Sequence, residues 1–221
     1  MLAQIGRRYD FRKGGLWDQP EISTVSSRRD RLPLALPISF SVIIVGLCVL
    51  VSLASLVFPG SINNYLVLYP ISVLEKPWTL ITYMFVHANF DHLLWNMLFL
   101  FFFGLELERR VGERMFLAIY MLSGVVAALG QMVLTSGPMV GASGALYGVM
   151  GALAIIAPEI RVLLFFILPL RIQHAVVVFA LIDFLSLGAA DSIAHMAHIL
   201  GLVMGLAFGY ALAGRQKRYY Y

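Results

Sequence analysis

Six apolar runs constrain this chain more than any other feature of its sequence. They cover approximately residues 37–58, 91–106, 115–134, 143–157, 172–188 and 193–213. A helix of about 20 apolar residues matches the hydrocarbon core of a bilayer, which is about 30 Å thick. The chain is also 60% hydrophobic and only 13% charged, whereas a soluble domain is about 45–50% apolar. The sequence therefore predicts an all-α polytopic membrane protein with six transmembrane helices.

Two apolar segments are short for a membrane span. The run at 143–157 extends roughly 22 Å as a helix, so we expect it to begin below the membrane surface. The segment 162–169 lies between Arg161 and Arg171 and is too short to cross. We expect it to be a loop segment at the membrane interface.

The placement of basic residues predicts the orientation of the spans. Six spans put both termini on one side of the membrane, and of the 16 Lys and Arg residues only Lys76 then falls on the opposite side. Because basic residues concentrate in cytoplasmic loops, we expect both termini to be cytoplasmic and the protein to lie in the cell membrane. The predicted parts are a basic N-terminal segment (1–36), a six-helix domain (37–213) and a short basic tail (214–221).

The basic N-terminal segment and the apolar spans also predict the interaction partners of the chain. The N-terminal segment is expected to touch anionic lipid, and we expect membrane-protein partners and no nucleic acid. The single cysteine, Cys48, lies within an apolar run and excludes a disulfide within the chain. Oligomeric state cannot be predicted from these features.

Polar residues inside spans are costly and are candidates for function. The first cluster is His87, His92 and Asn96 in HANFDHLLWN, with His92 and Asn96 on one helix face. Three interpretations stay open: a catalytic or transport site, hydrogen bonds between helices, and a metal site. A metal site would need a further ligand, so we expect none.

The second cluster is the G-A-S-G sequence at 141–144, with Ser143 in the first turn of an expected helix. Free backbone N–H groups at a helix N-terminus attract negative charge. Taken alone, however, a stripe of small residues favours helix packing. Gly144, Gly148 and Ala152 form such a stripe.

The third cluster is His198, followed by glycines at 201, 205 and 209 on one helix face. We expect this stripe to pack against the small residues of the fourth span and so to bring His198 near Ser143. A serine hydroxyl needs a base to become nucleophilic, and histidine is the usual base. His195, one turn earlier, is the competing base, but it lacks a glycine at the third following position.

Acyl transfer also needs hydrogen-bond donors for an oxyanion, and His92 and Asn96 are candidates at the same depth. Neither Asp183 nor Asp191 is expected to reach His198. The sequence therefore predicts a Ser–His dyad rather than a triad.

Taken together, these clusters resemble the rhomboid family of intramembrane serine proteases over residues 75–212. The family pattern H-x4-H-x3-N matches His87, His92 and Asn96, and G-x-S-G followed by a tyrosine matches 141–144 and Tyr147. The pattern A-H-x2-G-x3-G matches the sequence from Ala197 to Gly205. Three patterns in this order on the expected spans are highly specific.

The resemblance implies a role for each matching residue. Ser143 resembles the nucleophile and His198 the general base, while His92, Asn96 and the Ser143 N–H resemble the oxyanion site. Tyr147 resembles the ring that packs on the catalytic histidine, and His87 a residue that holds the outer loop. The glycines of the matching patterns, Gly141, Gly144 and Gly201, are expected to support the site. No cofactor or metal is implied.

The resemblance also implies features outside the catalytic residues. The loop at 59–86 would be half-submerged in the outer leaflet, the E-R-R sequence at 108–110 resembles a charged cluster of the family, and the fifth span, with Phe179 and Phe184, would be a side gate. One departure is Thr79 after Trp78, where many members have arginine. It affects a local polar contact and not the chemistry.

Three functions are compatible with a polytopic chain of this kind. The first is an intramembrane serine endopeptidase, which the combination of serine, histidine and oxyanion donors favours. The second is a rhomboid-like pseudoprotease that binds membrane segments without cutting them. The third is a small transporter, for which we would expect polar residues through the whole membrane depth or an inverted repeat, and the sequence has neither pattern.

Overall fold

A computed structural model describes residues 39–164, 167–189 and 193–218, so the predicted basic segment 1–36 lies outside the described residues. Within the described part, four helices are long and apolar enough to cross a membrane: α1 (Phe40–Val57), Phe90–Val111, α6 (Glu113–Leu134), and the first 20 residues of α9 (His195–Arg218). The second of these consists of α4 (Phe90–Phe99), the π-helical segment η3 (Leu100–Gly104) and α5 (Leu105–Val111).

Two shorter apolar helices complete the set, α7 (Ser143–Ile156) and α8 (Ile172–Leu185). Each of the six predicted apolar runs therefore contains a helix, and the protein is a mostly helical, multi-pass membrane protein. Helix α9 continues to Arg218, beyond the predicted start of the tail at 214.

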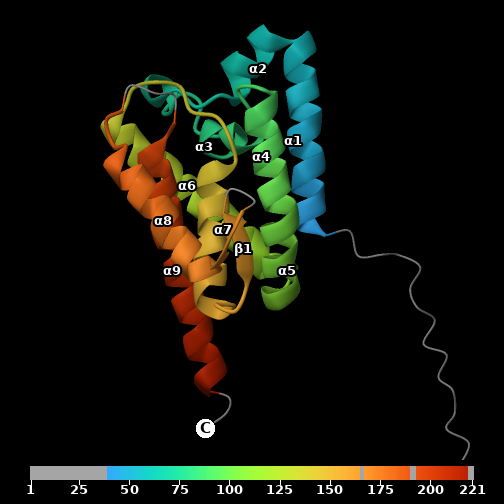
Figure 1. The fold of residues 1–221 in the computed structure, drawn as a ribbon. Coiled ribbons are helices and arrows are strands. Elements are labelled where there is room, and N and C mark those ends of the chain that lie inside the picture. The colour runs from blue at the N-terminus through green and yellow to red at the C-terminus, as the bar shows by residue number, and fades with distance from the viewer. Residues whose placement is uncertain (1–38, 165–166, 190–192, 219–221) are drawn as a thin grey trace, which may run out of the picture. The chain divides into compact units, whose positions relative to one another are not determined.

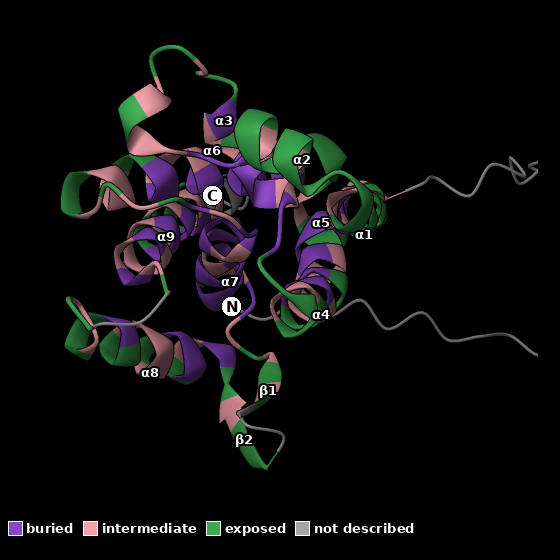
Figure 2. Ribbon diagram, turned by 90° about the horizontal axis from the view of Figure 1, so that it is seen from above, coloured by how far each residue is buried: buried purple, intermediate pink, exposed green. Residues whose placement is uncertain are grey.

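Helix α7 lies in the middle of the helices, between α6, α9 and α4 (Figure 1). Ten of its 14 residues are buried, and Figure 2 shows helix α7 surrounded by other elements, whereas α8 lies at the periphery. A helix that is apolar on all sides is expected to be buried on all sides. Its small residues allow the neighbours to approach its backbone closely.

The predicted pairing of two small-residue stripes is confirmed. A Cβ atom on Gly201 would overlap the carbonyl oxygen of Gly144, and one on Gly205 would overlap the carbonyl oxygen of Gly148. A Cβ atom on Gly209 would lie 2.9 Å from the carbonyl oxygen of Ala152. Helices α7 and α9 thus touch backbone to backbone along three turns, and this contact fixes the register of His198 relative to Ser143.

The connection at 59–86 is not an irregular loop. It contains helices α2 (Pro59–Leu66) and α3 (Thr79–Thr82) and the 3₁₀ turns η1 (Pro70–Ser72) and η2 (Tyr83–Phe85). Leu68 and Met139 exchange backbone hydrogen bonds of 3.2 and 2.8 Å, and the Gly141 N–H donates to the Tyr83 carbonyl at 2.9 Å. The connection therefore holds the backbone that leads into α7.

The segment 162–169, which was expected to be a loop, forms part of an antiparallel hairpin. Strand β1 (Arg161–Leu164) pairs with β2 (Leu168–Arg171), and Arg161 lies opposite Arg171. Pairing of the two strands satisfies backbone groups that an irregular segment would leave open at an apolar surface. Leu163 and Ile167 in this segment are exposed apolar residues.

The acidic residue of the E-R-R sequence anchors the start of α1. The Glu108 carboxylate accepts hydrogen bonds from Ser39 Oγ at 2.5 Å, Phe40 N at 2.7 Å, Ser41 N at 2.9 Å and Ser41 Oγ at 2.7 Å. Two of these donors are free N–H groups at the N-terminus of a helix, which need partners. Arg109 and Arg110 instead pair with Glu106.

Candidate active site

Ser143 and His198 lie in hydrogen-bond contact. His198 Nε2 is 2.9 Å from Ser143 Oγ, although the two residues are 55 positions apart. Ser143 is the first residue of α7 and His198 lies in the first turn of α9. This is the distance at which a base can take a proton from a hydroxyl.

The Tyr147 ring lies flat on the imidazole of His198. The two ring centroids are 4.4 Å apart and the planes are inclined by 10°. Tyr147 is one turn after Ser143 on α7, so both side chains face the same part of α9. The stacking restricts rotation of the imidazole about its side-chain bonds.

The first turn of α7 offers backbone donors beside Ser143. Its N-cap residue is Ala142, and no side chain of the described residues caps the helix there. The first N–H groups of a helix have no partner within the helix, so they are available to a negatively charged group next to Ser143.

Gly141 allows His92, a member of the first cluster, to lie close to Ser143. Its φ of +110° is a conformation that residues other than glycine rarely adopt. A Cβ atom at this position would also lie 2.6 Å from both Cε1 and Nε2 of His92. The imidazole of His92 therefore rests on the backbone two residues before the serine.

His87 and Asn96 both contact His92. The rings of His87 and His92 meet at 70° with centroids 5.1 Å apart, and Asn96 Nδ2 donates to the His92 carbonyl at 2.7 Å. Burial and the nearby His92, partly offset by the Phe85 backbone, lower the pKa of His87 from 6.5 to about 4. His87 is therefore neutral at physiological pH.

A cavity of about 150 Å³ opens beside Ser143. Its lining comes from three helices: Trp95, Asn96 and Phe99 of the second span, Ser143, Leu146, Tyr147 and Met150 of α7, and Phe179 of α8. A mostly apolar cavity with a few convergent polar groups is typical of a binding site. The amide of Asn96 and the hydroxyl of Ser143 share it.

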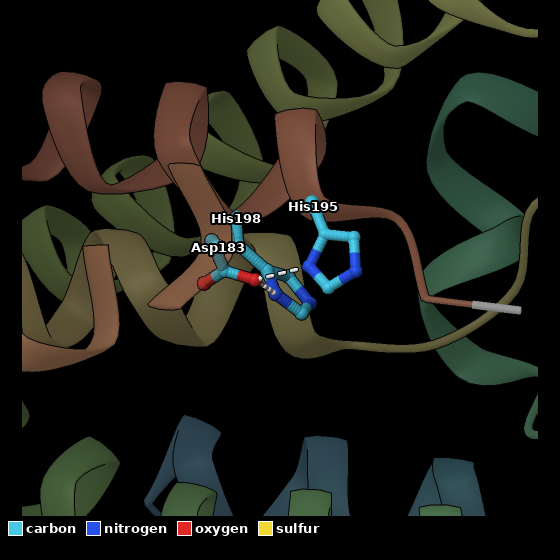
Figure 3. Close-up of side chains that lie close together, drawn as sticks. All are labelled: Asp183, His195 and His198. Carbon is cyan, nitrogen blue, oxygen red and sulfur yellow. Dashed lines mark hydrogen bonds and ion pairs between the residues drawn. The ribbon is translucent and has the colours of Figure 1, made fainter. Parts of the chain in front are cut away.

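The expectation that no carboxylate reaches His198 is wrong. Asp183 Oδ1 lies 2.9 Å from His198 Nδ1 and 2.7 Å from His195 Nδ1 (Figure 3). Asp183 is near the C-terminal end of α8, and the chain turns back so that this end lies beside the first turn of α9. Fifteen residues of separation concealed this contact in the sequence.

One signal for Asp183 was present in the sequence. It is the single ionisable residue in the apolar sequence AVVVFALIDFL, and such residues in membrane helices usually have a partner and a function. Asp183, His195 and His198 also form a group that could hold a metal ion, because their ligand atoms lie within 4.8 Å of one another. The earlier metal candidate, His87 and His92, is a different cluster.

Comparison with known proteins identifies the family. A Rhomboid domain matches residues 74–215, which is more than half of the chain. Rhomboid-related protein 1 of Caenorhabditis elegans is 34% identical over 153 residues, which cover 62% of this chain and 40% of that protein. Rhomboid protease AarA of Providencia stuartii is 40% identical over 62 residues, covering 28% of this chain and 22% of that protein.

A third relative matches a segment of similar length. Rhomboid-like protease 3 of Toxoplasma gondii is 39% identical over 57 residues, 26% of this chain and 22% of that protein. The chain matches less than half the length of each of these relatives. The extent of the domain match, together with the helical membrane fold, shows that this chain belongs to the rhomboid family.

Proposed function

We propose that this protein is an intramembrane serine endopeptidase that hydrolyses peptide bonds in or next to transmembrane segments of other membrane proteins. The observation that carries the proposal is the 2.9 Å contact between His198 Nε2 and Ser143 Oγ beside a cavity. The protease names of two relatives add to it.

In the proposed reaction, Ser143 Oγ attacks the carbonyl carbon of the scissile bond while His198 Nε2 takes its proton. The resulting oxyanion accepts hydrogen bonds from the Ser143 N–H, His92 and Asn96. His198 then gives its proton to the leaving amine, and the acyl group stays on Ser143. A water molecule, deprotonated by His198, hydrolyses this ester and restores the serine.

The proposed membrane arrangement has six spans, with α7 and α8 crossing together with the four longer helices. As a 14-residue helix, α7 is about 21 Å long, which is less than the hydrocarbon thickness. Ser143 would then lie below the outer surface at the base of a hydrated cavity, with both termini in the cytoplasm of a cell-membrane protein. The connection 59–86 would lie in the outer leaflet.

The cavity supports lateral entry of a substrate between the second span and α8. Trp95, Phe99 and Phe179 line it, and Phe184, near the end of α8, is 63% exposed. Separation of α8 from the second span would admit an unwound peptide to Ser143. Small or helix-breaking residues at the cleavage site should favour cleavage, because a helical peptide bond is shielded.

The experiment is cleavage of a reporter transmembrane substrate in liposomes by the wild type, Ser143→Ala and His198→Ala. We expect product from the wild type and a loss of at least about 1,000-fold in both variants. Undiminished cleavage by Ser143→Ala would overturn the proposal. Binding of the substrate without cleavage by the wild type would instead favour a rhomboid-like pseudoprotease.

A further inference from the structure

We propose that Asp183 is a positioning residue, which holds His198 in the tautomer that can accept the Ser143 proton, and that His195 fixes the Asp183 carboxylate. The inference rests on the proposed proteolytic function and adds a residue to it. Its basis is a chain of three contacts that runs from Ser143 through His198 to Asp183 and on to His195.

The first argument is the cost of placing a carboxylate where Asp183 lies. The residue is 3% exposed, while its neighbours Ile182, Phe184 and Leu185 are exposed apolar residues on the surface of α8. An unpaired carboxylate on such a helix would be strongly unfavourable. Two imidazole donors compensate this cost, so the carboxylate and the two histidines form one unit (Figure 3).

The second argument concerns the proton on His198. A carboxylate accepts hydrogen bonds and donates none, so the contact at 2.9 Å from Oδ1 assigns the proton of the neutral ring to Nδ1. The other nitrogen, Nε2, then carries the lone pair and faces Ser143 Oγ at 2.9 Å. The opposite tautomer would leave His198 unable to take the serine proton.

The third argument separates the roles of the two histidines. His195 Nδ1 is 2.7 Å from the same Oδ1 atom, and its ring is inclined by 84° to that of His198 with centroids 6.4 Å apart. His195 thus approaches the carboxylate from a different direction and restricts its rotation. Tyr147 stacks on the face of His198, so the base is held at its edge by Asp183 and on its face by Tyr147.

The same three side chains also have the composition of a metal site. A metal ion would require both Nδ1 atoms to lose their protons and an ion to lie between ligands. Instead, the two nitrogens contact one carboxylate oxygen at 2.7 and 2.9 Å, which are direct hydrogen-bond distances. The geometry therefore favours the hydrogen-bonded unit.

The kinetic test uses the full-length protein in liposomes with a reporter transmembrane substrate. Asp183→Ala removes the acceptor, and Asp183→Asn keeps the size but introduces an amide donor that can select the wrong tautomer. We expect kcat to fall about 10²–10⁴-fold in both variants, with KM changed by less than about threefold. His195→Ala should lower kcat only a few-fold.

Glu108→Gln is the matched control, because Glu108 is also a buried carboxylate with several donors but does not contact the site. It should lower the thermal midpoint while leaving kcat near the wild-type value at a temperature where it is folded. Wild-type kcat in folded Asp183→Ala and Asp183→Asn would overturn the inference. Loss of wild-type activity with EDTA, restored by Zn²⁺, would overturn it in favour of a metal site.

A second measurement holds even if the Asp183 variants do not fold. In the ¹⁵N spectrum of histidine-labelled wild type, assigned with His198→Gln, neutral His198 should carry its proton on Nδ1. A proton on Nε2 would overturn the inference. The two proposals are tested by different measurements. Absence of wild-type cleavage and of Ser143 labelling by a fluorophosphonate would count against the proposed proteolytic function. The tautomer of His198 tests the proposed role of Asp183.

Discussion

The contact between α7 and α9 leaves no space for a side chain at Gly201, so Gly201→Ala should separate Ser143 from His198. The added Cβ would overlap the carbonyl oxygen of Gly144 and lie 2.9 Å from its carbon and 3.3 Å from its Cα atom. These are backbone atoms, which cannot rotate away as a side chain can. Overpacking forces the backbone to shift, and we estimate that α9 must move away from α7 by about 1 Å to restore van der Waals distances.

A shift of this size would break the contact between Ser143 and His198. Their separation would grow from 2.9 Å to about 4 Å, which is too long for a hydrogen bond. Misplacement by about 1 Å commonly costs about 100-fold in rate, so kcat/KM for a reporter transmembrane substrate should fall by about that factor. Overpacking should also lower the stability of the fold by about 1–3 kcal/mol.

Gly46→Ala provides the matched control, because Gly46 lies in α1 and no described atom comes within 4 Å of the position of its added Cβ. Alanine is favoured over glycine inside a helix by about 1 kcal/mol, so this variant should retain full activity and stability. Cleavage rates and thermal unfolding of both variants are measured in the same detergent. Wild-type kcat/KM in Gly201→Ala would show that the backbone contact does not set the distance between Ser143 and His198.

Three further predictions address other parts of the structure. Tyr147→Phe should retain most activity because it keeps the ring that stacks on His198, whereas Tyr147→Ala should lose roughly tenfold in kcat; equal activity of the two variants would argue against a role for stacking. Glu108→Gln should lower the free energy of unfolding by about 1–3 kcal/mol, because it weakens four hydrogen bonds at the start of α1. An unchanged melting temperature would contradict the role of Glu108 in anchoring α1. The pKa of His87 is lowered from 6.5 to about 4 in the folded state, so the unfolded state binds more protons between these two pH values. The free energy of unfolding should therefore fall as the pH falls from 6.5 to 4, by up to about 3 kcal/mol. Unfolding measured across this range should show a dependence of stability on pH that His87→Phe removes.

The sequence predicted the helices because apolar length is a strong signal in membrane proteins. All six runs contain a helix, and the paired glycine stripes were predictable since small residues at intervals of three and four mark a close helix contact. The hairpin at 161–171 was not predicted. Its segments are short and apolar on both faces, so the spacing of apolar residues does not distinguish a strand from an interfacial loop.

The site was predictable where residues share a helix face and less so where the tertiary fold brings helices together. Spacing related His92 to Asn96, whereas Tyr147 was identified through the resemblance to the rhomboid family. The contact of Asp183 with His198 depends on how α8 turns back toward α9, which no local pattern specifies. The isolated acidic residue in an apolar helix was nevertheless visible, and the cost of burying it was reason to seek a partner.

The most direct test of the central proposal is covalent labelling of Ser143 in the wild-type protein. A fluorophosphonate probe reacts with a serine whose proton is taken by a base, so mass spectrometry should find the adduct on the peptide that contains Ser143, and at no other serine. Labelling should be absent in Ser143→Ala and strongly reduced in His198→Ala. A wild-type protein that is folded but not labelled at Ser143, or His198→Ala labelled at the wild-type rate, would contradict the proposal that His198 activates this serine.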